Sequence, residues 1–329
     1  MKKEGKTILV TGGAGYIGSH AVHRLVKEGH KVVVYDNMGN GHAENLPKEA
    51  ILINGDLSDK AKLDKVFKEN KFDAVIHFAG FIEAGESVIN PSRFYWNNVV
   101  NSLNLLDAMV QNNVKKIIFS STAALFGFPD QIPITEETRT GPINPYGKTK
   151  LVIEYMLEDF DTAYGLKHIA LRYFNAAGAD YGIGEDHKPE THLIPLVLDV
   201  ALGRRKEIKI FGTDYKTKDG TYIRDYIHVT DLVDAHILAL NKLLTENKSD
   251  KYNLGSEKGY SVKEIVEAAR KITGHPIPAV ETDRRPGDPA ILIADSAKIR
   301  KELGWKAKHD LNSIIKSAWE WHKKRFKTM

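Results

Sequence analysis

The first half of the chain alternates short apolar runs with longer segments of helical period. The runs are rich in β-branched residues and contain few polar positions, which is typical of parallel strands covered on both faces. Repeated strand–helix–strand order predicts an α/β fold built on a doubly wound parallel sheet. The expected strands are residues 7–12, 31–36, 51–56, 74–80, 115–121 and 168–175.

A glycine-rich turn follows the first of these runs. Gly13, Gly15 and Gly18 in "TGGAGYIGSH" fit the pattern G-x-G-x-x-G at the start of a helix. In this pattern the first glycine permits a tight turn, the second lets a pyrophosphate approach the backbone, and the third allows close helix–strand packing. Asp36 closes the next run, where a carboxylate binds ribose hydroxyls and repels a 2′-phosphate. The turn therefore predicts a Rossmann-type site for NAD rather than NADP.

The pattern changes after Asn175. Residues 176–193 have no periodicity and are expected to form a loop, whereas residues 222–229 are expected to form a strand. Helical spacing returns at 193–203, 230–245 and 261–273. We predict an NAD-binding Rossmann domain over 1–174, to which 222–240 return, and a smaller mixed α/β substrate-binding domain over 175–329.

Composition narrows the classes of function. The net charge is only +4 and charges of both signs are interspersed, which argues against a nucleic-acid partner. The chain has no cysteine, which excludes disulfides, thiolate catalysis and cysteine-ligated metals. No apolar run approaches the length of a membrane span, and the first apolar stretch is expected to be a strand rather than a signal peptide. We expect a cytoplasmic protein without a membrane partner.

Tyr146 and Lys150 stand four positions apart after a proline, in "NPYGKTK". This spacing places both side chains on one face of a helix. An unperturbed phenol has a pKa near 10, so Tyr146 is a poor base at neutral pH. The ammonium of Lys150 and a nicotinamide ring would both favour the phenolate, and we expect the pKa of Tyr146 to fall toward neutrality.

Several motifs, in order along nearly the whole chain, resemble those of one family. They are "VTGGAGYIGSH", "YDN", "IHFAG", "GESV", "FSSTAALFG", "PYGKTK", "LRYFNAAGA", "RDYIHV", "YNLG" and "RRPGDPA". The chain is similar to the extended short-chain dehydrogenase/reductases, and among them to the UDP-glucose (UDP-galactose) 4-epimerases. This resemblance implies a catalytic site of Tyr146, Lys150 and Thr122, although spacing alone does not exclude Ser121 in place of Thr122.

The resemblance also implies two sets of ligand-binding residues. Asp56 is open to two interpretations, an adenine contact or the N-cap of the following helix. The residues expected to bind NAD are Gly12, Gly13, Gly15, Tyr16, Ile17, Gly18, Asp36, Asn37, Asp56, Leu57, Phe78, Ala79, Gly80, Asn97, Tyr146, Lys150 and Tyr173. Those expected to bind a UDP-sugar are Thr122, Asn175, His192, Leu193, Ile208, Phe211, Arg224, Arg285, Asp288 and Leu292.

The reaction that the resemblance implies is inversion at carbon 4 of a UDP-hexose through a 4-keto sugar. Related dehydratases carry an Asp-Glu pair directly after the catalytic Thr, but this chain has Ala123 and Ala124 there. Dehydration is therefore disfavoured, while epimerisation of a UDP-glucuronate or UDP-pentose stays an alternative, as does a non-catalytic NAD-binding regulatory protein. The family implies a homodimer through helices at about 92–112 and 145–163.

Four further positions qualify this interpretation. Many family members have a lysine where this chain has Ile82, so one cationic contact near the nicotinamide is lost. Leu292 stands where a tyrosine narrows the sugar pocket of strict UDP-hexose enzymes, so an N-acetyl group could be tolerated. His187 and His192 lie in an acidic segment without the helical H-x-x-x-H spacing of many zinc sites, and we expect no metal.

Overall fold

The computed structural model describes residues 5–285 and 287–326. Packing divides the chain into two compact units, and neither is one continuous stretch. Unit 1 contains the chain up to Gly127 together with Thr140–Arg172 and Val233–Tyr252. Unit 2 contains Phe128–Arg139, Tyr173–Leu232 and the chain from Asn253 onward.

Unit 1 is built on a seven-stranded parallel sheet, which confirms the predicted fold class. Its strand order is β10-β6-β5-β4-β1-β2-β3, so the chain runs outward in both directions from β1. The strands are β1 (Thr7–Thr11), β2 (Lys31–Asp36), β3 (Ile51–Asn54), β4 (Ala74–His77), β5 (Lys116–Thr122), β6 (Lys167–Tyr173) and β10 (Asp250–Leu254).

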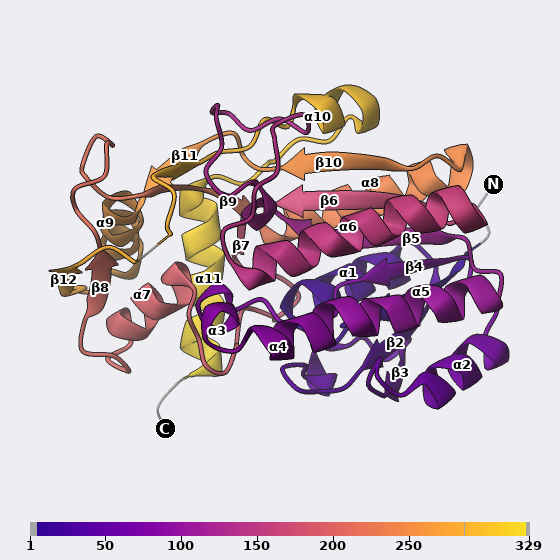
Figure 1. The fold of residues 1–329 in the computed structure, drawn as a ribbon. Helices are drawn as coiled ribbons and strands as arrows, with labels where there is room; N and C mark the ends of the chain where they lie inside the picture. Colours follow the sequence, from indigo (N-terminus) through magenta and orange to yellow (C-terminus); the bar gives the residue numbers. More distant parts are fainter. Residues whose placement is uncertain (1–4, 286, 327–329) are drawn as a thin grey trace. The chain divides into compact units, whose positions relative to one another are not determined.

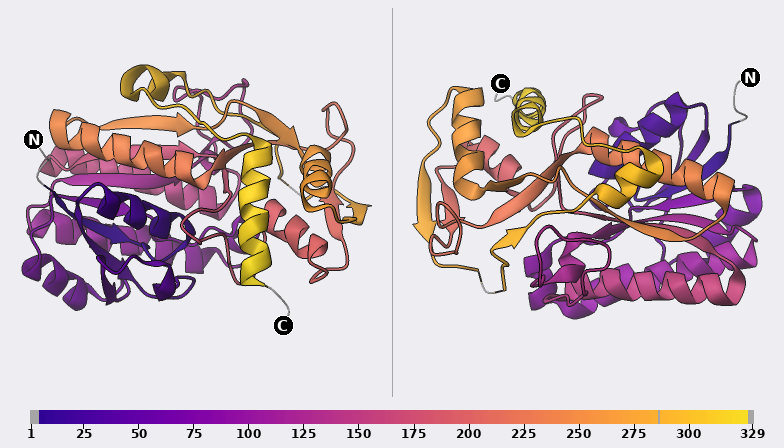
Figure 2. Two further views of the ribbon diagram at one scale, coloured as in Figure 1. Left: turned by 180° about the vertical axis from the view of Figure 1, so that it is seen from behind. Right: turned by 90° about the horizontal axis from the view of Figure 1, so that it is seen from above.

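Helices cover both faces of this sheet. Figure 1 shows α5 and α6 in front of the sheet, and the rear view in Figure 2 shows α1 and α8 on the opposite face. The helical segments are α1 (Tyr16–Lys27), η1 (Ala43–Asn45), α2 (Lys60–Glu69), α3 (Ala84–Ile89), α4 (Pro91–Phe94), the π-helical turn η2 (Tyr95–Val100), α5 (Asn101–Gln111), η3 (Ala123–Phe126), α6 (Pro145–Tyr164) and α8 (Val229–Glu246).

The central strands form where the sequence predicts them because their side chains are buried on both faces, whereas the edge strand β3 is partly exposed. Ile8, Leu9 and Val10 of β1 are fully buried, as are Val32–Val34 of β2. The strand order reverses at β1, which lies between β2 and β4. Open α/β sheets bind ligands at such a reversal, beyond the carboxyl ends of the strands. The glycine turn and the first acidic strand end, at Asp36, lie at that edge.

The long helix α6 has well-defined ends. Asn144 is its N-cap and accepts a hydrogen bond from the Gly147 N–H at 2.8 Å. Pro145 occupies the first helical position, where its missing N–H costs nothing, and Gly165 ends the helix in the left-handed conformation with φ 67°. These signals fix where the helix starts and therefore where Tyr146 and Lys150 stand.

Unit 2 has a small sheet centred on β9, with helices packed around a second core. Strands β7, β11 and β13 all pair with β9, and β8 pairs with β12. The helices α7, α9 and α11 contribute Val197, Ile265 and Ile315 to the core. The elements are β7 (Asn175–Ala177), α7 (Leu193–Ala201), β8 (Ile208–Phe211), β9 (Ile223–His228), β11 (Gly259–Ser261), α9 (Val262–Thr273), β12 (Ala279–Thr282), β13 (Ile291–Leu292), α10 (Ala297–Leu303) and α11 (Leu311–Arg325).

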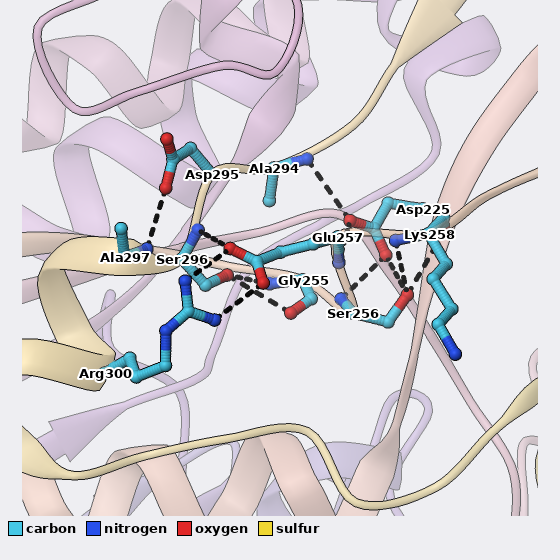
Figure 3. A network of polar contacts seen from close by, with 10 residues as sticks. All are labelled: Asp225, Gly255, Ser256, Glu257, Lys258, Ala294, Asp295, Ser296, Ala297 and Arg300. Atoms are coloured by element: carbon cyan, nitrogen blue, oxygen red, sulfur yellow. Dashed lines mark hydrogen bonds and ion pairs between the residues drawn. The ribbon is translucent and has the colours of Figure 1, made fainter.

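A network of polar contacts joins three segments of unit 2 (Figure 3). Asp225 of β9 accepts hydrogen bonds from the backbone N–H groups of Ser256 at 2.8 Å, Glu257 at 3.1 Å and Ala294 at 3.2 Å. Glu257 in turn pairs with Arg300 of α10 at 2.6 Å. The buried carboxylate of Asp225 thus accepts backbone N–H groups from the turn after β10 and from the segment between β13 and α10.

Several strands lie outside the sequence-based expectations: most of β7 and all of β8, β10, β11, β12 and β13. The predicted loop 176–193 begins inside β7, and β10 at the edge of the large sheet was not predicted because "DKYNL" begins with two charged residues. Within residues 5–285 and 287–326, no helix is both long and apolar enough to cross a membrane.

Candidate active site

The glycine turn between β1 and α1 brings two backbones into close contact. Gly12 has φ +70°, and a Cβ on it would stand 2.5 Å from the Ala79 nitrogen. A Cβ on Gly18 would stand 2.2 Å from the Gly12 carbonyl oxygen. Both positions therefore require glycine. The left-handed residue of the turn is Gly12. Gly13 lies inside the turn closed by the Gly15 N–H and the Gly12 carbonyl at 3.3 Å, and it packs against Val10 and Val34.

The N-terminus of α1 is open to an anion. Its N-cap is Gly15, no side chain caps the helix, and no acidic residue lies in the first turn. The Asp36 carboxylate accepts hydrogen bonds from the N–H groups of Ala14 and Met38, both at 2.9 Å, and is thereby fixed beside the turn. Backbone N–H groups of a helix start without a side-chain cap, next to a fixed carboxylate, fit the pyrophosphate and ribose of a dinucleotide.

Asp56 does not cap the following helix, because Asp59 accepts the hydrogen bond from Lys62 at the start of α2. Asp56 instead accepts hydrogen bonds from the Asn37 amide at 2.7 Å and the Ser58 N–H at 2.8 Å. Burial alone would raise the pKa of Asp56, but these hydrogen bonds lower it below its usual value. Of the two interpretations of Asp56, only the adenine contact stays a prediction.

The other residues predicted to bind NAD differ in their surroundings. The Asn97 amide donates to Asn98 at 3.0 Å, and Asn98 accepts the Phe81 N–H at 2.8 Å next to Gly80. Asn98, which sequence reasoning missed, thus holds the segment after β4 against the π-helical turn. Leu57 and Tyr16 are buried, and the phenylalanine ring of Phe78 lies 4.9 Å from that of His236 in α8. Ile17 and Tyr173 are partly exposed.

Tyr146 lies in the first turn of α6, where its N–H donates to Ser87 Oγ at 3.1 Å. Its phenol is hydrogen-bonded to the hydroxyl of Thr122 at the end of β5. Burial raises the pKa of Tyr146, the Thr122 hydrogen bond lowers it, and the charge of Glu83 raises it again. In the chain by itself the pKa is raised overall. The expected fall toward neutrality also depends on a bound nicotinamide ring and stays a prediction.

Ser121 points away from Tyr146. Its hydroxyl donates to Glu154 Oε1 at 2.5 Å, and the same carboxylate is paired with the buried Arg172 at 2.5 Å. Ser121 is therefore part of a buried ion-pair network between α6 and the sheet. Of the two candidates left open by spacing, only Thr122 contacts the tyrosine.

Lys150 is buried one helical turn after Tyr146. Its ammonium donates to the Ser120 carbonyl oxygen at 2.9 Å and lies 4.9 Å from the centre of the Phe119 ring. Burial lowers the pKa of Lys150 to about 8, and the opposing charge of Glu154 only partly offsets this. The ammonium also lies near Gly80, 3.6 Å from where a Cβ would stand. A buried cation thus stands at the carboxyl end of the sheet, beside Gly80.

In unit 2, five predicted substrate residues gather around β9. Arg224 donates to the Pro289 carbonyl at 2.9 Å, and its guanidinium lies 3.8 Å from the Asp288 carboxylate. Leu292 of β13 stands opposite Arg224 in the sheet register. The Arg285 guanidinium stacks on the Phe211 ring at 3.9 Å. Two arginines with an aromatic ring fit a nucleoside diphosphate.

The other predicted substrate residues of unit 2 lie in different structural settings. Asn175 starts β7 and pairs with Tyr226, whereas Ile208 is buried in the core of the unit. His192 is the N-cap of α7, immediately before Leu193. Sequence reasoning missed that His192 contacts Glu185 at 2.9 Å, because these residues come from an irregular loop.

Comparison with known proteins decides the family. The family model described as the NAD dependent epimerase/dehydratase family matches residues 8–255. The chain belongs to this family. Membership confirms the resemblance seen in the motifs and the NAD cofactor that it implied.

Individual relatives match over almost their whole length. A UDP-glucose 4-epimerase of Halalkalibacterium halodurans is 54% identical over 319 residues, which cover 96% of this chain and 95% of the relative. The crystal structure of a UDP-glucose 4-epimerase matches with a TM-score of 0.94 at 53% identity, covering 97% of this chain and 98% of that chain. The Brucella ovis enzyme in complex with NAD matches with a TM-score of 0.93 at 45% identity, covering 96% of this chain and 98% of that chain.

Proposed function

We propose that this chain is a UDP-glucose 4-epimerase, an isomerase that interconverts UDP-glucose and UDP-galactose. The observation that carries the proposal is the hydrogen bond between Thr122 and Tyr146 beside the buried Lys150. The relatives named UDP-glucose 4-epimerase support it. Ala123 and Ala124 follow Thr122, so the acid and base that dehydration needs are missing at these positions.

The cofactor-binding residues belong to unit 1. The first turn of α1 would hold the pyrophosphate, Asp36 the adenosine ribose, and Lys150 the nicotinamide ribose. Bound NAD accepts the hydride that leaves carbon 4 and gives it back, so the substrate is neither oxidised nor reduced overall. Ile82 supplies no charge near the nicotinamide, which leaves Lys150 as the cation proposed for that region.

Tyr146 would take the proton from the sugar 4-hydroxyl and return it after inversion. Thr122 would hydrogen-bond the same oxygen and relay the proton. Because burial raises the pKa of Tyr146 in the chain alone, the positive charges around the occupied site must lower it for this step. Arg224 and Arg285 would hold the diphosphate while the 4-keto sugar turns to present its other face.

The test is made on purified protein without added cofactor. Incubation with UDP-galactose should yield UDP-glucose, and the Tyr146→Phe variant should lose this conversion while keeping its bound NAD. Absence of conversion by the unaltered protein, even after NAD is supplied, would rule out the UDP-hexose assignment. UDP-glucuronate, UDP-pentoses and dehydratase substrates would then be tested in turn.

Leu292 supports a second, wider substrate range. Its side chain is smaller than the tyrosine found at this position in strict UDP-hexose enzymes, and it stands opposite Arg224. We propose that UDP-N-acetylglucosamine is also converted. Leu292→Tyr should abolish that conversion but retain UDP-galactose turnover, and loss of both activities together would contradict a gating role.

We also propose a homodimer formed through helices at 92–112 and 145–163. Apolar side chains are exposed there, including Trp96 at 65% and Tyr155 at 53%. Trp96→Asp should convert a dimer into a monomer in light scattering, and a monomer before substitution would contradict the proposal. A cytoplasmic location, expected from the composition of the chain, is likewise a proposal that cell fractionation would test.

A further inference from the structure

We propose that the loop between β7 and α7 binds one zinc ion through the side chains of Glu185, His187, Glu190 and His192. These four residues follow one another within the segment "EDHKPETH" of unit 2. Each offers one ligand atom, and the four atoms lie within 4.8 Å of one another. The family match and the relatives assign no metal to this chain, and the proposed epimerase chemistry uses none.

The histidine nitrogens and glutamate oxygens already lie close to one another. With zinc–ligand bonds of about 2.0–2.1 Å, neighbouring donors in a tetrahedral site are about 3.3 Å apart. His192 Nδ1 lies 2.9 Å from Glu185 Oε1 and 2.8 Å from Glu190 Oε1. His187 Nδ1 lies 3.3 Å from Glu185 Oε1 and 3.9 Å from Glu190 Oε2. The two Glu190 distances involve different carboxylate oxygens, so coordination requires the Glu190 carboxylate and the imidazoles to reorient around the ion.

The chemistry of the donor set favours zinc. Two imidazole nitrogens and two carboxylate oxygens are ligands that zinc accepts in four-coordinate sites. With neutral imidazoles, the two carboxylates carry a charge that balances a divalent cation. Calcium and magnesium prefer six or more oxygen ligands or retained water, which two histidines do not supply.

The site is enclosed and its ligands are oriented. Glu185 is buried, the side chains of His187 and Glu190 are only 15% and 14% exposed, and that of His192 is 35% exposed. The carboxylate of Glu190 accepts the backbone N–H groups of Thr191 at 2.7 Å and His192 at 2.8 Å. Such outer hydrogen bonds fix a ligand before the metal arrives. His192 provides the accessible side for entry.

An ion here would act on the end of a helix. His192 is the N-cap of α7, and Leu193 is its first residue. Binding of one ion by four residues of an eight-residue segment would fix the loop at the N-terminus of α7. We therefore infer a structural clamp that orders the start of α7, rather than a catalytic metal, because all four coordination positions are filled by protein.

The experiment uses the full-length protein with a tag that contains no histidine. It is loaded with zinc at pH 8, passed through gel filtration, and analysed for bound metal by mass spectrometry. Cobalt loading provides a second readout, the visible absorption of a tetrahedral site. His187→Gln and Glu190→Gln remove one ligand each, and His275→Gln alters an exposed histidine outside the loop as the matched control.

We expect about one zinc per chain in the unaltered protein and in His275→Gln. The two ligand variants should bind zinc at least about 100-fold more weakly. Zinc should raise the thermal midpoint of the unaltered protein and of His275→Gln, but not that of the ligand variants. Circular dichroism establishes whether each variant is folded. If the unaltered protein keeps no more zinc than the folded variants, or if it binds cobalt without tetrahedral absorption, the proposal is wrong, and the cluster serves as an ion-pair network alone.

Discussion

Thr122 and Ser121 are neighbouring residues with the same hydroxyl group and different partners. Thr122→Ala removes the group that contacts Tyr146, so we expect the epimerase kcat to fall by about 100-fold or more. Ser121→Ala removes a hydrogen bond to buried Glu154, and we expect a loss of about 1–3 kcal/mol in the free energy of unfolding. Its kcat should stay within a few-fold of the value for the unaltered protein. Steady-state kinetics and urea unfolding of both variants check the two expectations.

A larger loss of kcat in Ser121→Ala than in Thr122→Ala would contradict this assignment. The conservative variant Thr122→Ser keeps the hydroxyl and serves as the control. It should retain most of the activity, since only a methyl group is removed.

The lowered pKa of Lys150 predicts that the free energy of unfolding depends on pH above neutrality. Burial lowers its pKa from the ordinary 10.5 to about 8, so the unfolded chain binds more protons than the folded chain between these values. Stability therefore rises with pH in this window, by about 2 kcal/mol between pH 7.5 and 9.5. Lys150→Met lacks this gain. The difference between the two unfolding free energies, measured by urea titration of cofactor-free protein, should shift by that amount in favour of the unaltered chain.

Sequence spacing placed Tyr146 and Lys150 on one helical face, because helix geometry is local. It could not predict the direction of the Tyr146 pKa, since that depends on how much of the phenol is buried and on Thr122 from a distant strand. It also could not separate Thr122 from Ser121, because the packing of β5 against α6 decides which hydroxyl meets Tyr146 and which meets Glu154.

Two glycines with similar backbone conformation allow a matched test of the turn between β1 and α1. Gly12 has φ +70° and touches the backbone of Ala79, whereas Gly29 has φ +88° and nothing within 4 Å of a Cβ. Gly29→Ala should cost only the conformational strain, about 1–2 kcal/mol. Gly12→Ala adds a steric overlap and should cost at least about 3 kcal/mol.

Gly12→Ala should also lose bound NAD, because moving Ala79 displaces the strand end beside the turn. Thermal unfolding and the amount of NAD that copurifies with each variant measure both effects. Equal destabilisation by the two substitutions would show that the close approach of Gly12 to Ala79 has no energetic importance.

At the level of elements, the buried strands and the capped helices were predictable from sequence, since apolar runs and caps are local signals. The edge strand β10 was not predicted, because its pairing with β6 rests on partners about eighty residues earlier rather than on its own apolar content. The donor cluster in the loop from Glu185 to His192 was missed for a similar reason: a helical spacing rule does not describe side chains that an irregular turn brings together.

For the molecule as a whole, the interleaving of the two units predicts how fragments behave. Residues 1–172 lack α8 and β10, so the edge of β6 and the apolar surface under Ile237 and Leu240 would be exposed. We expect this fragment to aggregate or to unfold without a cooperative transition. A version in which residues 229–254 follow residue 172 through a glycine–serine linker is the matched control and should regain a cooperative melt by circular dichroism. A cooperative melt of 1–172 alone would contradict the expectation.

The position of β10 in the chain also affects synthesis on the ribosome. The seventh strand of the sheet emerges only after all of Tyr173–Leu232 has been translated. At elongation rates of about 5–20 residues per second, the edge of β6 that later pairs with β10 stays unpaired for roughly 4–16 s. During that interval the nascent chain can pair with another polypeptide as readily as with its own later segment. Because of the strand order of unit 1, we expect chaperones that bind nascent chains to associate with this protein during its synthesis.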